Sequence, residues 1–557
     1  MKAVHVPFLP ESPAQALSAT AVQRRTFLIG AGAAALCGAE AASCAPATVD
    51  FAAELPAAIR SAVAAGRHGI DVTPFLRRVL ATGTGRQIVF APGRYGFDSR
   101  ILGEEGLVLR NATALVGAGP DQTVFEVLGN TSHRFLVAND SSDITLEGLG
   151  LIGSGHSQGD TDGSALLALH TAQATSAMER IRVARCRLQN FRAPYWIHIA
   201  NLNPRGWAVR DISIEALTAV SMPGNSIDPA DIGRHAAVIF IDGAAGPISE
   251  IAISGLDIEA AHIKCGIGLF RSVSSARISD VRIVNAGRFG AQDNSGGYAI
   301  LAYDSRGGMA DIVIERATIT APRSCGIYVA AGSRVSVLQS TISGQTDIRS
   351  DTLPKAAIAF NGTSAPVVEG CTFADNVCDI FAFAPHSNAP FSARFVNLSS
   401  TGSSRASIIC SWSGGTGQRE WRDLTISGCA IESNGTGIAL RNSPARYISN
   451  VLIDSCTITA PYGIDLFYDS GSPATGYVVR NCTINARKSA LVARSFEGSL
   501  SIEGGQFVAT GPEAAGLVLQ GSPRTAVSSV RFKGYATRQL AVAADRQPAV
   551  AGIAFDR

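Results

Sequence analysis

A short pattern recurs along most of this chain and constrains its fold more than any other feature. In its clearest copy, Asn481-Cys482-Thr483-Ile484-Asn485, polar and apolar side chains alternate after the cysteine. The later steps between cysteine positions are 27, 26, 23 and 25 residues (456 − 429, 482 − 456, 505 − 482, 530 − 505). A period in this range indicates a repeat architecture. The cysteine positions of the copies form a ladder: Leu149, Cys186, Ile212, Leu256, Val281, Ala317, Ser340, Cys371, Leu398, Cys429, Cys456, Cys482, Gly505 and Val530.

The content of each period predicts β-strands rather than helices. Residues 463–467 and 477–484 are typical runs, rich in Ile, Val and Leu and bounded by Gly, Asn, Ser or Asp. Apolar residues alternate along these runs, which is the strand period. Each period is therefore expected to form one coil of two or three strands, and coils must stack in parallel because a single coil cannot bury its own apolar face. Cys429, Cys456 and Cys482 would then stack inside.

Composition narrows the possibilities further. The 557 residues carry a formal net charge of +2, so no strong field favours a nucleic-acid partner. Hydrophobic residues make up 46% and charged residues 17%, which is enough apolar material for a large core. Most of the 11 cysteines lie in the repeats, where they resemble small buried residues more than a disulfide framework. Since no CxxC or Cys/His cluster has zinc spacing, no metal site is predicted.

Residues 1–47 are predicted to direct export rather than to fold. Arg24-Arg25-Thr26-Phe27-Leu28 opens a mild apolar run and resembles a twin-arginine signal. The run ends near Ala39, which is too short for the ~20 residues of a stable membrane span. The resemblance implies transport by the twin-arginine translocation machinery to the periplasm or the exterior.

Three further regions follow. Residues 48–85 are predicted to form a helical cap, with short helices over residues 51–63 and 72–80. Such a cap would cover the unpaired backbone at the end of a solenoid. Residues 86–540 are predicted to form the β-helix, and residues 541–557 a C-terminal tail.

A family resemblance begins at the helical region. A short helix, then IVFAPGRYGF at residues 88–97 and ALVGAG at residues 114–119, resembles the opening of the pectin lyase-like right-handed parallel β-helix superfamily. Combined with the export signal, the chain also resembles exported bacterial β-helix repeat proteins. The resemblance implies an all-β fold, a single-stranded right-handed parallel β-helix with an N-terminal helical cap. It does not imply one activity, because that superfamily contains lyases, hydrolases, epimerases, transferases and non-enzymes.

Insertions interrupt the ladder in its first half. The steps 186 − 149, 256 − 212 and 317 − 281 are 37, 44 and 36 residues. The excess falls in residues 153–163, 221–235 and 287–297, with a smaller insertion at 344–355. All follow a ladder strand, so they are expected to project from one edge. Polar loops gathered on one edge of a rigid scaffold often carry function.

The strand after these insertions carries the candidate site. Its aligned copies are residues 167–170, 197–200, 239–242, 267–270, 300–303, 327–330 and 358–361. Because side chains alternate along a strand, every second residue should point outward, on rungs about 4.8 Å apart. Aromatic and polar side chains along such a strip suit a polysaccharide. The predicted substrate-binding residues are Phe240, Phe270, Tyr303, Tyr328 and Asn361 on the strip, and His235 and Asp293 in the insertions.

Three functions remain open. Glycoside hydrolysis needs two carboxyl groups, and Asp242 and Asp304 lie two rungs apart, about 10 Å between backbones. Arg271 lies on the rung between them. Polysaccharide lysis by β-elimination would instead use Lys264 or Arg271 to neutralise a uronate, with His170, His198 or Tyr303 transferring the proton. Calcium is a candidate cofactor of that reaction, although no compact Asp cluster is present.

The third function is a non-catalytic exported repeat protein that binds glycan or scaffolds a cell-envelope partner. Short turns in the C-terminal half favour it. The sequence favours a carbohydrate-active enzyme, with hydrolase slightly ahead of lyase.

Overall fold

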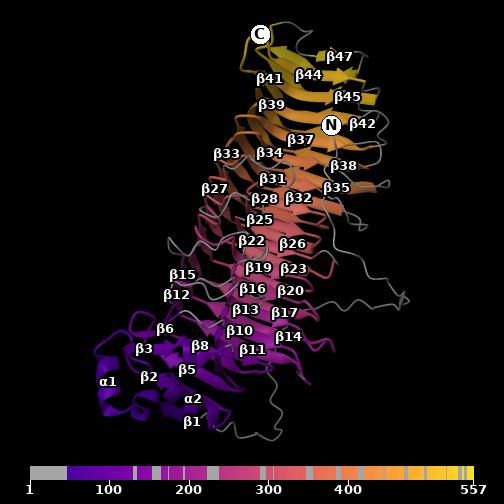
Figure 1. Cartoon of the computed structure of the whole chain (residues 1–557). Coiled ribbons are helices and arrows are strands. Elements are labelled where there is room, and N and C mark those ends of the chain that lie inside the picture. Colours follow the sequence, from indigo (N-terminus) through magenta and orange to yellow (C-terminus); the bar gives the residue numbers. More distant parts are fainter. Residues whose placement is uncertain are drawn as a thin grey trace, which may run out of the picture. The chain divides into compact units, whose positions relative to one another are not determined.

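The computed structural model describes the chain from residue 47 to residue 556, apart from internal gaps. Nearly every strand pairs in parallel with its counterparts one coil earlier and one coil later, as Figure 1 shows. The sequence prediction of a parallel β-helix is therefore confirmed. The described residues are 47–103, 105–129, 134–153, 165–173, 175–191, 195–221, 237–288, 297–304, 307–345, 355–383, 391–411, 419–442, 446–468, 474–494, 498–521, 524–536, 542–544 and 548–556.

Each coil contributes a strand to an 18-stranded sheet, here called sheet A. The strands of sheet A are β1 (Ala47–Asp50), β2 (Arg86–Phe90), β5 (Thr113–Gly117), β8 (Ile144–Glu147), β11 (Met178–Ala184), β14 (Val209–Glu215), β17 (Ile248–Ser254), β20 (Ser274–Ser279), β23 (Ala310–Glu315), β26 (Ser333–Leu338), β29 (Val367–Glu369), β32 (Phe391–Val396), β35 (Arg419–Ser427), β38 (Arg446–Asp454), β40 (Tyr477–Arg480), β42 (Ser499–Glu503), β45 (Arg524–Ser528) and β48 (Ala549–Ala551).

The remaining strands belong to a 31-stranded sheet with two families of strands, which the long strands β39 (Thr457–Tyr468) and β41 (Thr483–Arg494) join. The first family, the ladder strands, follows sheet A in each coil. Its members are β3 (Gly93–Asp98), β6 (Thr123–Leu128), β9 (Gly150–Ile152), β12 (Arg187–Gln189), β15 (Thr218–Val220), β18 (Asp257–Glu259), β21 (Arg282–Val284), β24 (Thr318–Thr320), β27 (Thr341–Ser343), β30 (Thr372–Ala374), β33 (Ser399–Ser403), β36 (Ala430–Ser433), β43 (Gln506–Ala509), β46 (Arg531–Lys533) and β49 (Ala554–Asp556).

The second family, the strip strands, completes the coil. Its members are β4 (Leu107–Val108), β7 (Arg134–Asn139), β10 (Ala165–Thr171), β13 (Tyr195–Asn201), β16 (Ala237–Asp242), β19 (Cys265–Phe270), β22 (Tyr298–Tyr303), β25 (Cys325–Ala330), β28 (Ile358–Asn361), β31 (Cys378–Phe383), β34 (Ala406–Ser411), β37 (Thr436–Asn442), β44 (Ala515–Gln520) and β47 (Val542–Ala544). Strands β47, β48 and β49 continue the pattern past residue 540, where the sequence predicted a tail.

Backbone hydrogen bonds confirm the ladder with one correction. The N–H after each ladder position donates to the carbonyl of the previous ladder residue, as from Thr483 to Cys456 at 2.9 Å. Between Cys186 and Leu256, however, these bonds pass through Leu217, since Thr218 donates to Cys186 and Asp257 to Leu217. The predicted member Ile212 lies in β14 of sheet A and pairs with Ile181 and Ile251.

The residue directly before a ladder position commonly forms a left-handed corner. Gly428, Ser455 and Asn481 have φ values of 63°, 54° and 55°. This left-handed conformation costs most residues roughly 1–2 kcal/mol but is easily adopted by glycine and tolerated by asparagine. The motif Asn481-Cys482 thus combines a tolerant corner residue with a small inward side chain.

The interior is one continuous apolar cluster. Ile, Val and Leu occupy most inward positions, and Cys429, Cys456 and Cys482 are all at most 2% exposed. The nine cysteines of the described part are buried and free, so their prediction as small core residues is confirmed. The thiols of Cys456 and Cys482 donate to backbone carbonyl groups, which satisfies these polar groups inside the stack.

Helices precede the regular coils. The predicted helix over residues 51–63 is divided, because Pro56 holds the preceding Leu55 in an extended conformation. It forms a 3-10 helix, η1 (Phe51–Glu54), and α1 (Ala57–Ala64). The second predicted helix is present as α2 (Thr73–Ala81), and a short α3 (Ser99–Leu102) follows β3.

Helix α1 lies close to the first ladder strand. A Cβ atom at Gly93 would lie 2.8 Å from the Val63 carbonyl oxygen, so only glycine fits there. Val63 of α1 and Leu76 of α2 are part of the main core cluster. Their role as an end cap stays a prediction.

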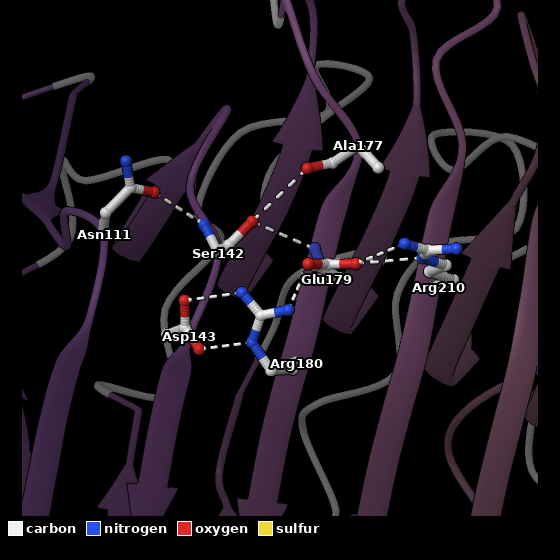
Figure 2. Close-up of polar contacts among 7 residues, drawn as sticks. All are labelled: Asn111, Ser142, Asp143, Ala177, Glu179, Arg180 and Arg210. Atoms are coloured by element: carbon white, nitrogen blue, oxygen red, sulfur yellow. Dashed lines mark hydrogen bonds and ion pairs between the residues drawn. The ribbon is translucent and has the colours of Figure 1, made fainter. Parts of the chain in front are cut away.

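The outer face of sheet A carries charged side chains that pair between successive coils. Figure 2 shows one such chain, in which Arg180 donates to Asp143 at 2.5 and 3.0 Å and also contacts Glu179. Glu179 in turn pairs with Arg210 of the next coil at 2.8 Å. Arg334 and Asp311 repeat the arrangement further along the stack, at 2.5 and 2.7 Å. These side chains are half exposed, so the face is solvated.

Candidate functional site

The strip strands have the predicted register. Ile197, Ile239, Ile267, Ile300 and Ile327 pair in sequence from β13 to β25. Their side chains belong to the main core, whereas the outward residues form a second, separate apolar cluster. The predicted outward direction of the strip is therefore confirmed. We call these outward side chains of the strip strands the strip.

Most of the strip is nevertheless buried. His170, His198, Phe240, Asp242, Phe270 and Tyr328 are between 3% and 7% exposed. Tyr303 is better exposed, at 38%. Alternation along a strand predicts which way a side chain points, but not whether it is exposed to solvent. Here neighbouring aromatic rings shield one another from solvent.

The sequence missed two members because the strands break their alternation. In β13, Trp196 and Ile197 both point into the main core, so Tyr195 lies in the strip cluster. Tyr298 occupies the same register three coils later, in β22. Strict alternation from Ile197 would place Tyr195 inside. The sequence does not reveal that two consecutive residues of β13 point inward; the only hint is that the bulky Trp196 lies next to Ile197.

Aromatic rings run continuously along the N-terminal part of the strip. The Tyr195 and Phe240 rings stack with centroids 4.4 Å apart and an interplanar angle of 13°. Phe240 contacts Phe270 at 4.7 Å, and Phe270 contacts Tyr303 at 5.8 Å. Such contacts contribute roughly 0.5–1.5 kcal/mol each beyond the buried area. The chain of rings leads from the buried interior of the strip to the exposed Tyr303.

Two histidines form a hydrogen-bonded pair at the start of this chain. His170 Nε2 and His198 Nδ1 are 3.0 Å apart, and His198 also packs against Tyr195 at 4.5 Å. Burial lowers the pKa of His170 to about 4, helped by Arg134. Burial also lowers the pKa of His198 well below its ordinary value. Both rings are therefore neutral at pH 7. His198 Nε2 is buried without a hydrogen-bond partner among the described residues.

Asp242 forms the charged centre of the site with Arg271. Arg271 Nε donates to Asp242 Oδ1 at 2.8 Å, and a second guanidinium nitrogen contacts Oδ2. The Asp242 side chain is 8% exposed and that of Arg271 39%, so the pair connects the buried strip with solvent. Burial raises the pKa of Asp242, and the guanidinium of Arg271 opposes that shift.

The backbone that carries Arg271 is strained. Arg271 and Ser272 have φ values of 45° and 47°, the left-handed region that non-glycine residues rarely adopt. Asp304 holds this turn, because its Oδ2 accepts from Ser272 N at 3.1 Å and from Gly308 N at 2.6 Å. Strain that surrounding structure maintains is common at functional sites. Asp304 itself is fully buried and acts here on the backbone.

The other predicted residues are distributed as follows. Tyr328 and Asn361 contact each other, with Asn361 Nδ2 donating to the tyrosine oxygen at 2.9 Å. Lys264 lies just before β19, and its carbonyl accepts from Gly297 and Tyr298. His235 and Asp293 lie outside the described residues, as do most residues of the predicted insertions. Within the described part, no group of three or more His, Cys, Asp or Glu side chains could hold a metal ion. Calcium binding therefore stays a prediction.

A buried carboxyl group inside the stack also escaped the sequence reasoning. Asp379 of β31 is 1% exposed and points inward, where it accepts from Asn376 at 3.0 Å and from Ser400 and Ser403 at 2.5 Å. Burial raises its pKa. Because these neighbours satisfy the carboxyl group, its position fits a structural role.

Comparison with known proteins supports the fold. The family described as the right handed beta helix region matches residues 238–402, which run from within β16 to within β33 and include the Asp242–Arg271 pair. Together with the parallel registers, this match identifies the chain as a right-handed parallel β-helix protein. The parallel β-helix implied by the resemblance at residues 88–97 and 114–119 is thereby confirmed, whereas the helical cap stays a prediction. No curated protein sequence matches the chain.

Solved structures that match this chain include proteins of several kinds. The catalytic unit of a GH87 alpha-1,3-glucanase from Streptomyces thermodiastaticus strain HF3-3 is 16% identical, with a TM-score of 0.36 over 84% of this chain and 66% of that chain. A mannuronan C-5 epimerase A-module from Azotobacter vinelandii is 13% identical, with a TM-score of 0.30 over 83% of this chain and 94% of that one.

Bacteriophage phi29 gene product 12, in its pre-mature form, is 11% identical, with a TM-score of 0.38 over 89% of this chain and 72% of that one. This chain thus spans just under two thirds of the glucanase unit. At these identities and TM-scores the likenesses carry no argument about activity.

Proposed function

We propose that this chain is a carbohydrate-active enzyme that cleaves an extracellular or periplasmic polysaccharide, with Asp242, Arg271 and His198 at the reaction centre. One observation carries the proposal: a buried carboxyl group and a buried neutral histidine lie on adjacent strip strands, beside exposed Arg271 and Tyr303. Aromatic rings next to hydrogen-bonding and charged groups suit the apolar faces and hydroxyl groups of a sugar chain.

Hydrolysis is the first candidate reaction. A general acid must keep its proton near neutral pH; burial raises the pKa of Asp242, although the guanidinium of Arg271 opposes that shift. Asp242 would protonate the glycosidic oxygen as the bond breaks. The second carboxyl group that the sequence suggested, Asp304, accepts from two backbone N–H groups, so the structure favours Asp242 over Asp304 as the acid.

Elimination is the second candidate, and His198 favours it. If His198 Nδ1 donates to His170 Nε2, the His198 Nε2 atom carries a lone pair that can accept the proton next to a uronate carboxylate. Arg271 can neutralise that carboxylate, because guanidinium binds carboxylates through two parallel hydrogen bonds. The remaining hypothesis is that the protein binds glycan without cleaving it.

The test is a polysaccharide panel that follows reducing ends and the absorbance of an unsaturated product together. The variants are Asp242→Asn and His198→Gln. Asp311→Asn is a matched control, because Asp311 also pairs with an arginine through two hydrogen bonds but lies on sheet A. We expect the wild type to produce reducing ends without the absorbance of an unsaturated product. Among the variants, Asp242→Asn alone should lose the production of reducing ends.

A chromophore that disappears in His198→Gln would assign elimination instead. Cleavage that survives both substitutions, or disappears equally in Asp311→Asn, would refute the site. If no glycan is cleaved, the non-catalytic reading replaces the enzyme.

The export prediction belongs to this proposal. A polysaccharide substrate outside the cytoplasm requires transport, and the arginine pair at residues 24–25 is the sequence feature that supports it. That region lies outside the described residues. In the described part, no helix has the length and hydropathy to cross a membrane.

A further inference from the structure

A second group of exposed side chains lies on the strip far from Asp242. Arg441 of β37, Phe467 of β39 and Arg494 of β41 pair in register, so they occupy successive rungs of the outward face. Phe467 is 39% exposed, which is unusual for a large apolar side chain on this strip. Both arginines are exposed as well. We call these three residues and Asp465 the C-terminal patch.

Asp465 gives the patch an unfilled hydrogen-bonding position. It lies two residues before Phe467 on the same strand, and its side chain is 20% exposed. Its Oδ1 atom is buried without a hydrogen-bond partner among the described residues, and Arg494 approaches it only to 3.6 Å. That distance makes an ion pair but exceeds a hydrogen bond. A buried acceptor without a donor is costly, so a shift of the Arg494 guanidinium toward Asp465 when a ligand binds would stabilise it.

The charge of the patch indicates the ligand. Two guanidinium groups flank one ring, and one of them lies near the single carboxylate, which leaves an excess of positive charge among these four residues. Guanidinium groups bind carboxylates in a bidentate manner, and an exposed ring packs on the apolar face of a sugar.

The position of the patch connects it to the proposed reaction centre. Eight strand pairings separate β16, which carries Asp242, from β39, which carries Phe467. At about 4.8 Å per pairing the separation is about 38 Å along one straight face. A polymer that runs along the strip can therefore reach both sites, whereas a short oligosaccharide cannot.

We propose that the C-terminal patch is a second, non-catalytic binding site for an acidic polysaccharide of uronate type, which holds the same chain that reaches Asp242. The inference rests on the proposed function for the glycan nature of the ligand, but it does not require cleavage. Phe467 packs against a sugar ring, Arg441 and Arg494 bind carboxylates of the polymer on either side of it, and Asp465 orients Arg494. Two linked sites raise the apparent affinity for a long chain, because the second contact becomes intramolecular.

The experiment measures binding rather than turnover. Alginate is the acidic probe and dextran the neutral one, each as a long polymer and as a short oligomer, at low and high salt. The test variants are Phe467→Ala and the double substitution Arg441→Ala with Arg494→Ala. Phe555→Ala and Arg334→Ala are matched controls, because Phe555 is also 39% exposed and Arg334 is an exposed arginine of sheet A.

We expect wild type to bind long alginate, with affinity that falls as salt rises. The double arginine variant should weaken that binding about a hundredfold, since it removes two charged contacts and each is worth about one tenfold step. Phe467→Ala should weaken it several-fold, and both controls should match wild type. Binding of the short oligomer should be weaker throughout.

Three results would overturn the inference. They are equal binding of wild type and the patch variants, equal loss in the controls, and binding of dextran as tight as that of alginate. The outcome is separable from the proposed function. If alginate binding depends on the patch but no glycan is cleaved, the binding role of the patch is supported and the proposed enzymatic function is refuted. If glycans are cleaved in an Asp242-dependent way but binding does not depend on the patch, the enzymatic function is supported and the binding role is refuted.

Discussion

The two outer faces of the same coils differ in how far their outward side chains are exposed to solvent. On sheet A the outward positions carry arginine and carboxylate side chains that pair from coil to coil and stay half exposed. On the strip the outward positions carry His170, His198, Phe240 and Phe270, which are nearly inaccessible to solvent. The rung spacing is alike on both faces. The paired residues of sheet A, such as Arg180 and Asp311, have φ values of 58° and 57°, whereas these four strip residues have no positive φ. Side-chain type and backbone conformation together therefore decide whether an outward position becomes solvated surface or a second core.

This difference predicts where stability resides. Exposed ion pairs typically contribute 0 to about 1 kcal/mol, because solvent screens them and ordering long side chains is costly. A buried aromatic side chain removes a large apolar area from water and adds ring contacts. The strip should therefore contribute far more stability per residue than the charged chains of Figure 2.

The strongest test of this difference is a cavity in the strip. Phe240→Ala should lower the free energy of unfolding by about 3–5 kcal/mol, because it empties a space between Tyr195 and Phe270. Urea unfolding followed by circular dichroism measures the change. Arg210→Ala on sheet A is the control and should cost no more than about 1 kcal/mol. Equal effects of the two substitutions would mean that the faces are energetically alike.

A second test uses acid. A histidine with a folded pKa of about 4 and an unfolded pKa of 6.5 binds protons more readily when unfolded, so stability falls as pH drops through this window. For His170 the loss is about 3 kcal/mol from pH 7 to pH 4. Replacing His170 and His198 together by phenylalanine should remove that part of the pH dependence. It leaves no unpaired partner, so stability at pH 7 should change little.

The comparison of wild type and the double variant in urea at pH 7 and pH 4 isolates the histidines, because all carboxyl groups are common to both proteins. Parallel losses of stability would show that the pair is not responsible.

The smallest effect concerns the charged face itself. Asp143→Asn removes the carboxylate that Arg180 contacts at 2.5 and 3.0 Å, and should cost at most about 1 kcal/mol. The difference from wild type should shrink further in 1 M salt, where the screening length is about 3 Å. A cost above that of Phe240→Ala would reverse the comparison between the faces.

The sequence predicted the coils well because their period and alternation are physical requirements of stacking. It placed Ile212 in the ladder where Leu217 belongs, and the reason is local. Ile212, Ile214 and Leu217 are all inward residues of one coil, and the corner residue before Leu217 is Ala216, with φ 48°. Glycine or asparagine at that corner would have revealed the register, whereas alanine gives no such signal.

The candidate site was predictable only in part, for a related reason. Alternation gave the outward direction of His198 and Asp242, and spacing put Arg271 on the adjacent rung. The contact between Asp242 and Arg271 fits that spacing. Spacing could not show that Asp304 binds backbone N–H groups, because that depends on the left-handed turn at Arg271 and Ser272. Nor could it show Tyr195 in the strip, since the paired inward residues of β13 are a tertiary feature.

The uniform hydrogen bonding between ladder residues has a consequence for length. Because each coil pairs only with its neighbours, distances along the stack change in whole coils of about 4.8 Å. Removing the 27 residues from one ladder position to the next (398 − 371) would bring Asp242 and Phe467 one rung closer without altering the strands that pair with either. The number of coils thus sets which lengths of polymer can reach both places at once, independently of the chemistry at each.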